Sequence, residues 1–408
     1  MQNQIFKREY YLNKIRGFYE SDLVKVITGI RRCGKSCFML SVIDDLKERG
    51  ISDADIIYLN LDTRPYLNVT TPSALSEAID PLISDGRKKY IFIDEVQNVR
   101  GFERIVNAYR ESGHSLFITG SNSYLLGGEL VTKLTGRYIE IEMFTLTFNE
   151  YLDMKRFLGL TVTDDTHGEF DEYIRQGGFP KALEFPNADD RALYTQSIIE
   201  QIFDKDIARN RKIRNVASFE RVKNFVINNF GSMISAQSIA AALKKEQIAV
   251  TPQTVTRYLE ILESAKIIYS CPRFDLRSKK ALSGEQKYYL ADLGIYFSQN
   301  VDARVNYGAA LENILFCYLK TKGYKLSVGR IGNLECDFIT RKRDDYYYIQ
   351  VAMTIMDPVT EEREYRPFER IRDNYPKYLF TLDTLRQNRN GIKNTDIAAF
   401  MRDGKDLG

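Results

Sequence analysis

Short apolar runs alternate with helical stretches along the first third of the chain. The runs are rich in branched and aromatic residues, and each is too short for a helix of ordinary length. They lie at Val24–Ile27, Ile56–Leu61, Tyr90–Ile93, Ser115–Thr119 and Tyr138–Met143. Longer stretches with helical character, such as Cys37–Glu48, stand between them. This alternation predicts an α/β domain over residues 1–145, with a parallel sheet of about five strands and a site at the C-terminal ends of those strands.

The rest of the chain changes its pattern twice. Residues 146–204 mix helix and loop, and we interpret them as a helical lid or linker. Two amphipathic helices, Ser235–Lys244 and Gln253–Ser264, then precede two strand-like runs, and the second helix starts beside a proline. Helix, turn, helix and hairpin in this order predict a winged helix within residues 205–290. Residues 291–408 continue with a helix, strands, a helix and a strand, the pattern of a small α/β domain.

Composition and charge narrow the class of protein. The five cysteines form no CxxC pair, and two histidines are too few for a His-rich zinc site or a His-based catalytic triad. No apolar run reaches the length of about 18 residues that a membrane helix needs, and the N-terminus lacks the apolar core of a signal peptide. We therefore expect a cytoplasmic protein without membrane association. The net charge is only +3, but residues 205–280 hold about fifteen lysines and arginines against about six acids. The basic charge is thus concentrated in the predicted winged-helix segment.

The clearest chemical motif follows the first apolar run. The string GIRRCGKS, residues 29–36, fits the GxxxxGK[ST] phosphate loop, with a strand before it and a helix after it as the motif requires. Glycines let backbone N–H groups converge on phosphate oxygens. Lys35 would pair with the β- and γ-phosphates, and the Ser36 hydroxyl would bind Mg²⁺. The residues expected around the nucleotide are Gly29, Ile30, Arg31, Arg32, Cys33, Gly34, Lys35, Ser36 and Cys37. The motif therefore predicts ATP and Mg²⁺ as cofactors.

Two carboxylates follow a later apolar run. Tyr90–Ile93 ends in Asp94 and Glu95, which is the Walker B pattern. Asp94 would hold the metal shell, and Glu95 would polarise the attacking water as the general base. The next strand ends at a polar segment in which Ser121 or Asn122 would orient this water. An ordinary strand-ending turn is the alternative for that segment.

Further residues near the loop carry two interpretations each. Arg137 is a candidate arginine finger, a residue that stabilises the charge developing on the phosphates. Arg31 and Arg32 lie inside the loop and would touch nucleotide, a neighbouring subunit or nucleic acid. For each arginine the alternative is a solvated surface position. Cys33 and Cys37 flank Lys35, and inert small side chains are favoured there over a redox switch.

Together these motifs resemble a known family. The loop is similar to the GxRRxGKS loop of the AAA-type ATPases of archaea and bacteria, related to the archaeal ATPases. Further matching motifs lie at Phe92–Gln97, Ile118–Asn122, Leu134–Tyr138, Phe148–Tyr151, Gly177–Pro180 and Lys287–Gly294, so the resemblance spans nearly the whole chain. It implies ATP binding, a winged-helix segment and a C-terminal domain resembling the PD-(D/E)XK fold of restriction endonucleases. It implies no cellular role.

The C-terminal segment departs from the pattern of that nuclease fold. Glu312 lies on its first helix, and Glu335 and Asp337 share one face of a strand. Nucleases of this fold carry Glu-x-Lys on the following strand, whereas this chain has Gln350-Val351-Ala352. Because the second acid and the lysine are missing, we expect residues 291–408 to be inactive as a nuclease. A migrated site at Glu335 and Asp337 is the alternative.

The leading hypothesis is an AAA-type ATPase whose hydrolysis of ATP drives a conformational switch or motor coupled to nucleic acid. The expected partners are double-stranded DNA, through residues 205–290, and further copies of the chain if Arg137 acts across a subunit boundary. One alternative is a signalling ATPase whose winged helix and C-terminal domain bind protein. Another is a nuclease that ATP regulates.

Overall fold

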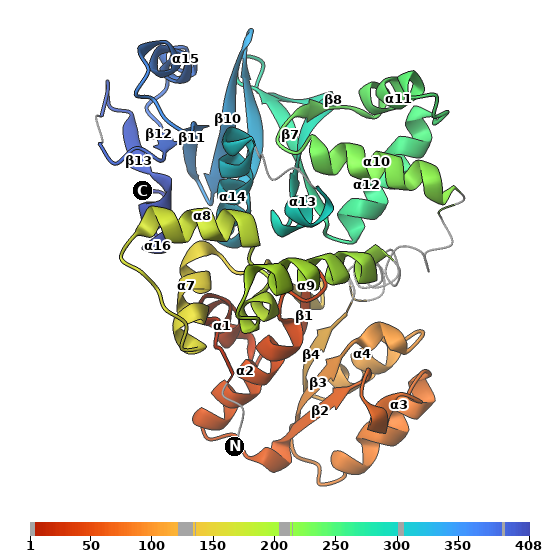
Figure 1. Cartoon of the computed structure of the whole chain (residues 1–408). Coiled ribbons are helices and arrows are strands. Elements are labelled where there is room, and N and C mark those ends of the chain that lie inside the picture. The colour runs from red at the N-terminus through yellow and green to blue at the C-terminus, as the bar shows by residue number, and fades with distance from the viewer. Residues whose placement is uncertain are drawn as a thin grey trace. The chain divides into compact units, whose positions relative to one another are not determined.

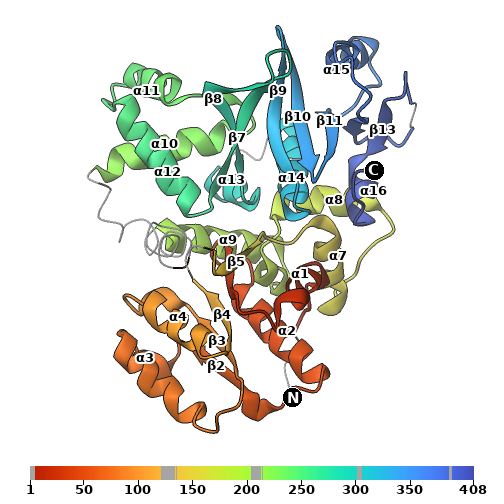
Figure 2. The same cartoon turned by 180° about the vertical axis from the view of Figure 1, so that it is seen from behind.

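A computed structural model describes residues 5–120, 134, 136–203, 213, 215–300, 306–385 and 388–408. The chain divides into two compact units, residues 1–143 and 144–408. Figure 1 and Figure 2 show the elements of each unit from opposite sides. Among the helices described, none is long and apolar enough to cross a membrane.

The first unit is built on a five-stranded parallel sheet. Its strands are β1 (Val24–Gly29), β2 (Ile56–Asn60), β3 (Tyr90–Asp94), β4 (Ser115–Thr119) and β5 (Tyr138–Met143). Its α-helices in the described residues are α1 (Glu9–Ile15), α2 (Lys35–Glu48), α3 (Pro72–Ile79) and α4 (Glu103–Glu111). The predicted parallel α/β sheet is confirmed, and each of the five apolar runs forms one strand.

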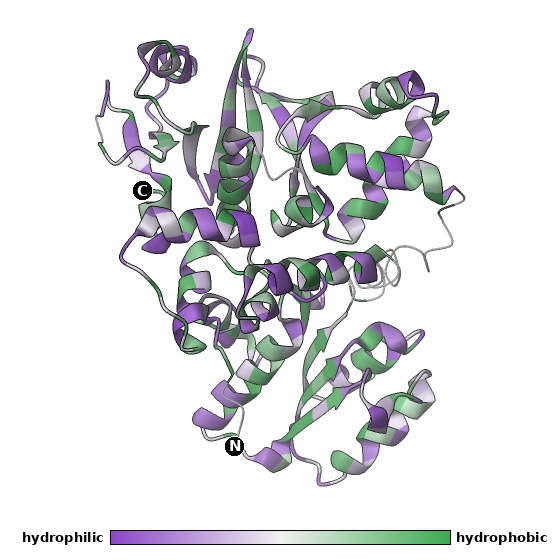
Figure 3. Ribbon diagram, in the orientation of Figure 1, coloured by the Kyte–Doolittle hydropathy of each residue, from purple (hydrophilic) through white to green (hydrophobic). Residues whose placement is uncertain are grey.

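The central strands of this sheet are buried on both faces. Every residue of β1, β3 and β4 is buried, which explains why their apolar runs are continuous rather than alternating. The strands of this sheet are mostly green, the hydrophobic colour, in Figure 3. Lys25 in β1 is an exception in composition, and its ammonium donates hydrogen bonds to the Ser21 carbonyl and the Ser115 hydroxyl, both at 2.9 Å. These two bonds partner the buried nitrogen, and burial lowers the pKa of Lys25 to about 7.

Strand order determines where the motifs meet. The order is β2-β3-β4-β1-β5, and all neighbouring strands are parallel. β4 therefore lies between β1, which leads into the phosphate loop, and β3, which ends at Asp94. The C-terminal ends of parallel strands share one edge of a sheet. Thr119, the last residue of β4, is consequently placed between the two motifs.

The second unit combines helices with an eight-stranded mixed sheet. Its α-helices in the described residues are α7 (Phe148–Phe157), α8 (Thr166–Gln176), α9 (Ala188–Gln201), α10 (Val216–Asn228), α11 (Ala236–Lys245), α12 (Pro252–Ser264), α13 (Gly294–Gln299), α14 (Tyr307–Thr321), α15 (Pro358–Glu369) and α16 (Ile397–Arg402). Its strands are β6 (Met233–Ile234), β7 (Ile268–Asp275), β8 (Lys280–Leu290), β9 (Lys325–Ile331), β10 (Leu334–Lys342), β11 (Asp345–Val351), β12 (Lys377–Thr381) and β13 (Lys393–Asp396).

Helices α10, α11 and α12 and the β7–β8 hairpin occupy the segment in which a winged helix is predicted. The Thr251 side chain caps α12 by accepting a hydrogen bond from the Thr254 N–H, and Pro252 opens the helix. The apolar positions Val255, Leu259 and Leu262 are buried, as the sequence pattern predicts. Their burial gives α12 an apolar face toward the core and leaves its polar face outward.

One sheet joins this segment to the C-terminal part of the chain. The strand order is β13-β12-β11-β10-β9-β7-β8-β6. β7 pairs with β9 in parallel, with Arg273 opposite Val328 and Asp275 opposite Arg330. The boundary predicted at residue 290 falls at the end of β8, so strands of both predicted domains hydrogen-bond within one sheet. The division into residues 146–204, 205–290 and 291–408 stays a prediction.

Candidate functional site

The phosphate loop connects β1 to α2 and depends on two glycines. Gly29 has a φ of 141° and Gly34 a φ of 102°, which L side chains rarely adopt. A Cβ on Gly29 would lie 2.2 Å from the carbonyl oxygen of Met143. Both motif glycines are therefore required by the backbone itself, and they bring the chain to the N-terminus of α2, where N–H groups can receive an anion.

Lys35 opens α2 and is folded back into the loop. Its ammonium donates hydrogen bonds to the carbonyl oxygens of Gly29, at 3.0 Å, and Ile30, at 3.3 Å. A phosphate bound in the loop would compete with these carbonyls for the ammonium. The buried Arg8, which precedes α1, donates a hydrogen bond of 3.4 Å to the Cys33 carbonyl and so holds the backbone of the phosphate loop. Arg8 lies far from the motif in sequence, and no pattern in the sequence pointed to it.

Asp94 is a buried carboxylate at the end of β3. Its residue is 0% exposed. Oδ2 accepts hydrogen bonds from the Tyr58 hydroxyl and the Asn60 amide, both at 3.1 Å, and Oδ1 accepts one from the Thr119 hydroxyl. Donors from β2 and β4 thus hold Asp94 from both sides and compensate for its burial. Tyr58, Asn60 and Thr119 are site residues that the sequence motifs did not reveal.

Glu95 follows Asp94 in a left-handed backbone conformation. Its φ of 59° and ψ of 46° are uncommon outside glycine, and such strain gathers at functional sites. Its N–H donates a hydrogen bond of 3.0 Å to the Thr119 hydroxyl, and its carboxylate accepts one from the Gln97 amide. Thr119 therefore positions both Walker B residues.

Arg137 lies at the other edge of the sheet. It precedes β5, whose first residue Tyr138 is paired with Val24, the first residue of β1. Because β1 and β5 are parallel, Arg137 lies at the N-terminal edge, whereas Lys35 follows the C-terminal edge. Its guanidinium donates to the Asn107 side chain at 3.4 Å and is about half exposed. Arg137 and the phosphate loop of the same chain are thus not brought together.

The other residues predicted around the nucleotide differ in how exposed they are to solvent. Arg32 is exposed and Arg31 is half-buried, both in the loop. Cys33 is buried, and burial raises the pKa of its thiol, which keeps it protonated and unreactive at neutral pH. Cys37 is exposed. Ser121 and Asn122, the predicted water-orienting residues, lie outside the described residues.

A second cluster of charged side chains lies in the second unit. The Lys287 ammonium, from β8, is 2.9 Å from Glu312 on α14 and 2.9 Å from Glu335 on β10. It is also 3.5 Å from Asp337 on β10. Burial opposes the charge of Lys287, but the carboxylates of Asp337, Glu312 and Glu335 together raise its pKa well above its ordinary value. The structure therefore brings the three acids together around a lysine that sequence reasoning had noticed only as part of a motif.

Gln350 completes this cluster with a neutral amide. The Asp337 N–H donates to Gln350 Oε1 at 2.9 Å, and the Val351 N–H donates to Asp337 Oδ2 at 2.9 Å. Gln350 Nε2 donates to Glu364 at 3.0 Å. The Gln350 amide thus both accepts and donates a hydrogen bond. A carboxylate in place of Gln350 would have no proton to donate to Glu364, and the two acids would repel each other. Ala352 adds no polar group.

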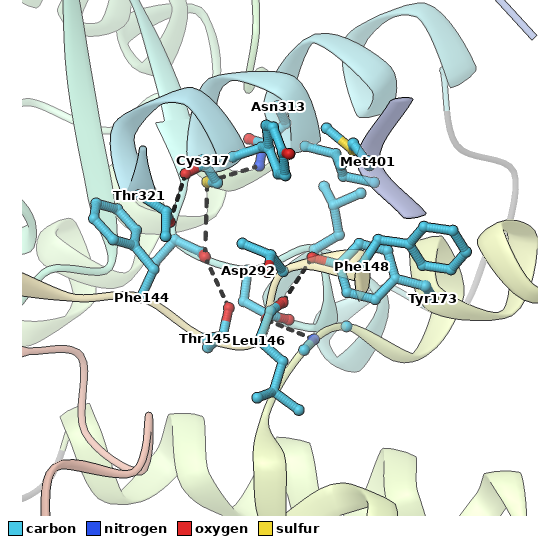
Figure 4. Close-up of a pocket in the computed structure, with 17 residues that line it drawn as sticks. Phe144, Thr145, Leu146, Phe148, Tyr173, Asp292, Asn313, Cys317, Thr321 and Met401 are labelled. Atoms are coloured by element: carbon cyan, nitrogen blue, oxygen red, sulfur yellow. Dashed lines mark hydrogen bonds between the residues drawn. The ribbon is translucent and has the colours of Figure 1, made fainter. Parts of the chain in front are cut away.

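The glycines of the 177–180 motif have a structural partner. The buried Asp292 carboxylate accepts hydrogen bonds from the N–H groups of Gly178 and Gly294, both at 2.8 Å. Figure 4 shows Asp292 among the residues that line the pocket next to these glycines. A Cβ on Gly177 would lie 2.0 Å from Asp292 Oδ1, and one on Gly178 would lie 2.4 Å from the Leu146 carbonyl. Close packing against Asp292 and Leu146 explains why glycine is needed at both positions. These motif residues have a structural role within the second unit.

Comparison with known proteins gives a domain assignment and two relatives that match most of the chain. Residues 21–152 match an AAA domain, and residues 167–303 match a domain of unknown function. An uncharacterized protein of Haemophilus influenzae is 34% identical over 388 residues, which cover 93% of this chain and 94% of the relative. An uncharacterized protein of Methanocaldococcus jannaschii is 29% identical over 356 residues, which cover 85% of this chain and 78% of the relative.

Solved structures agree with the fold. The Walker-type ATPase of Pyrococcus abyssi matches with a TM-score of 0.51 at 16% identity, over 73% of this chain and 96% of that chain. At this identity the likeness concerns the fold alone. The AAA match covers β1, the phosphate loop and the strand that ends at Asp94. The chain therefore belongs to one family with the Haemophilus influenzae protein, and its AAA domain identifies it as an ATPase.

Proposed function

We propose that this ATPase hydrolyses ATP with Mg²⁺ at the C-terminal edge of the first sheet. The observation that carries the proposal is Asp94, a fully buried carboxylate at the same edge of the sheet as the phosphate loop. Burying a charge costs stability unless it is paired or hydrogen-bonded, and here side chains from both neighbouring strands are used to orient it. A side chain that hydrogen bonds from two neighbouring strands hold in one orientation is suited to a functional site.

The side chains at this edge fit a magnesium ion. Mg²⁺ prefers hydroxyl, carboxylate and phosphate oxygens and keeps several waters. The Ser36 hydroxyl, at the start of α2, would be its protein ligand. Asp94 already accepts three hydrogen bonds, so it fits the role of orienting a water of the metal shell. The bound ion would neutralise charge on the phosphates, and Lys35 would add a second cation there.

Glu95 is proposed as the general base. Its carboxylate would take a proton from the water that attacks the γ-phosphate. The Gln97 amide and the Thr119 hydroxyl hold the side chain and the backbone of Glu95, respectively, so the base is pre-positioned. ATP turnover by the purified protein with and without Mg²⁺ tests this part. ATP turnover that continues in excess chelator would contradict the proposed requirement for Mg²⁺. Full turnover in Glu95→Gln would contradict the proposed role of Glu95 as the general base.

Arg137 is proposed to act on the nucleotide of a neighbouring copy. A strand rises about 3.3 Å per residue, so the first and last of the six residues of β5 lie roughly 17 Å apart. This separation supports an arginine finger in trans and argues against one in cis. It implies a homo-oligomer as the active form.

A nucleic-acid partner is the second part of the proposal. In the β7–β8 turn, Arg277, Lys279 and Lys280 are exposed. Arg277 also lines a surface pocket together with Arg370 and Arg372, which follow α15. The apolar residues that line the same pocket are Leu276, Ile331 and Ile371. None of these three arginines forms an ion pair with another described residue. Unpaired arginines on a shared surface are suited to the phosphates of double-stranded DNA.

The proposed winged helix would dock α12 against the same DNA. A winged helix that binds protein is the competing function, and the unpaired arginines favour DNA. The discriminating measurement is ATP turnover with and without double-stranded DNA, at low and at high salt. Stimulation that falls with salt supports coupling to nucleic acid, whereas turnover unaffected by DNA supports protein docking.

The C-terminal segment is proposed to bind rather than cut. Cleavage of a phosphodiester needs a metal held by converging carboxylates and a cation for the developing charge. Gln350 is neutral, and both ends of its amide are committed to Asp337 and Glu364. Incubation with plasmid and Mg²⁺ or Mn²⁺ tests the proposal. Cleavage that is lost in Asp337→Ala but kept in Lys35→Ala would contradict it.

A further inference from the structure

We propose that the Lys287 ammonium is the resident cation of the Glu312, Glu335 and Asp337 cluster and occupies the place that a divalent metal ion would otherwise take. The inference goes beyond the missing Glu-x-Lys motif, because it assigns the site a permanent positive charge from a different part of the chain. It does not depend on ATP hydrolysis.

The geometry is that of an ammonium site. Lys287 is 4% exposed, and its three N–H donors match three carboxylates in number. The Lys287 ammonium lies 2.9, 2.9 and 3.5 Å from Glu312, Glu335 and Asp337 and donates hydrogen bonds to Glu312 and Asp337, whereas Mg²⁺ holds oxygens at about 2.1 Å. In the part of the chain that the structure describes, no three carboxylate, thiol or imidazole groups are arranged to hold a metal ion.

Each of the three carboxylates has at least one oxygen that already faces a donor. One oxygen of Glu312 accepts hydrogen bonds from Lys287 at 2.9 Å and from the Tyr289 hydroxyl at 3.1 Å. Asp337 Oδ2 accepts from the Val351 N–H, and Oδ1 faces Lys287. A divalent ion would have to replace these donors and would be repelled by the nearby ammonium.

Access does not explain the exclusion of metal. A surface pocket is lined by Glu312, Asp337, Gln350 and Glu364, so ions in solution can reach the cluster. The charge of Lys287 is therefore the feature that separates this cluster from a metal site. Because Lys287 comes from the hairpin and its partners come from α14 and β10, the same ammonium also ties the predicted winged-helix segment to the C-terminal segment.

Manganese binding to the full chain without nucleotide tests the inference, with free Mn²⁺ measured by electron paramagnetic resonance. Wild type and Asp337→Asn should bind Mn²⁺ equally, because the cluster contributes nothing. Lys287→Met, which keeps the length of the side chain and removes its charge, should bind at least about tenfold more tightly. This gain should disappear in the double variant with Asp337→Asn. Lys287→Arg keeps a cation and should behave as wild type.

Two results would overturn the inference. One is a wild-type affinity for Mn²⁺ that falls in Asp337→Asn, since it would show metal bound at the cluster. The other is a folded Lys287→Met that binds no more Mn²⁺ than wild type. Circular dichroism establishes folding, and if Lys287→Met folds only with Mn²⁺ present, the metal replaces the ammonium as proposed. If it folds in neither condition, the comparison of wild type with Asp337→Asn still decides.

Discussion

The hydroxyl of Thr119, at the end of β4, donates a hydrogen bond to the carboxylate of Asp94, at the end of β3. The same hydroxyl oxygen accepts a hydrogen bond from the N–H of Glu95 at 3.0 Å. One side chain from the intervening strand therefore fixes the proposed metal-shell residue and the proposed base relative to each other. This arrangement makes Thr119 a positioning residue for the reaction.

Replacing Thr119 by valine should slow hydrolysis while ATP binding persists. Valine has nearly the same shape but can neither donate to Asp94 nor accept from Glu95. A hydrogen bond to a charged group is worth about 1.5–3 kcal/mol, so we expect kcat to fall by roughly 10- to 100-fold. Single-turnover hydrolysis and ATP affinity measure the two effects separately. Thr119→Ser keeps the hydroxyl and is the matched control, and equal rates for the valine and serine variants would contradict the role.

The two motif residues should fail in different ways. Lys35→Ala removes the cation proposed to pair with the phosphates and should abolish turnover. Glu95→Gln should keep ATP binding and lose about 10²-fold or more in rate, as expected for the loss of a general base. Binding of a fluorescent ATP analogue, compared with steady-state turnover, separates the two. Wild-type turnover in Glu95→Gln would show that another group activates the water.

Local patterns predicted much of the first unit. The apolar runs predicted the five strands correctly because both faces of the sheet are covered. The phosphate loop could be recognised because its residues are consecutive in the sequence. Thr119, Tyr58 and Asn60 were not readable as site residues. Each converges on Asp94 only after strands distant in sequence pair in the order β2-β3-β4-β1. A hydroxyl at a strand end has no sequence signature of its own.

The charged cluster of the second unit was even harder to predict from the sequence. The resemblance to the nuclease fold draws attention to Glu312, Glu335 and Asp337 in the sequence, and Ala352 stands where that fold has a lysine. The ammonium that the structure supplies comes from Lys287, which lies 25 residues before Glu312 and 50 before Asp337, on the other side of the boundary predicted at residue 290. No spacing rule connects a hairpin residue to a later helix and strand. Only tertiary structure brings them together.

Mixing two inactive variants should restore activity if Arg137 acts in trans. Lys35→Ala chains lack the phosphate cation but carry Arg137, and Arg137→Ala chains have the opposite defect. A mixed interface can therefore hold one intact site. ATP turnover of the mixture should exceed that of either variant alone and should peak near equal proportions. A monomer that retains full activity at high dilution would contradict the proposal.

Removing the surface arginines should weaken DNA binding and its salt dependence. Each lost phosphate contact flattens the slope of log affinity against log salt by roughly one unit. The test variant carries Ala at Arg277, Arg370 and Arg372, and a second carries Ala at Arg257, Lys279 and Lys280. The control removes the same charge from exposed positions elsewhere in the second unit, at Lys181, Arg402 and Lys405.

Fluorescence anisotropy with labelled double-stranded DNA measures these slopes. Both test variants should lose affinity for all sequences alike, because phosphates carry no sequence information. The control should stay close to wild type. If all three variants lose affinity equally, net charge rather than this surface governs binding. If none loses affinity, the segment is better explained as a protein-docking surface.

Glu312 should make the protein less stable as pH rises toward 8. Burial, followed by the nearby charge of Asp337, raises the pKa of Glu312 from 4.5 to about 8, although Lys287 and Tyr289 act in the opposite direction. One ammonium cannot balance three carboxylates, so the cluster retains a proton that the unfolded chain has already released. The folded state then binds more protons between these two pKa values, and stability falls with rising pH by at most about 1.4 kcal/mol per pH unit for one group.

The matched variant for this effect is Glu312→Gln, which keeps an acceptor for Lys287 and Tyr289 but cannot ionise. Its unfolding free energy should decline less steeply than that of wild type between about pH 5 and pH 8, because Glu312 no longer contributes. Lys287 does not contribute to the change in stability between about pH 5 and pH 8. Its pKa is raised, so the stability that it contributes is fully present below its ordinary value of 10.5 and is lost only above it. Asp337, whose pKa is also raised, mainly by burial, contributes with the same sign and remains in both proteins. Urea unfolding at several pH values measures the difference in slope, and parallel curves for wild type and Glu312→Gln would show that Glu312 does not hold the extra proton.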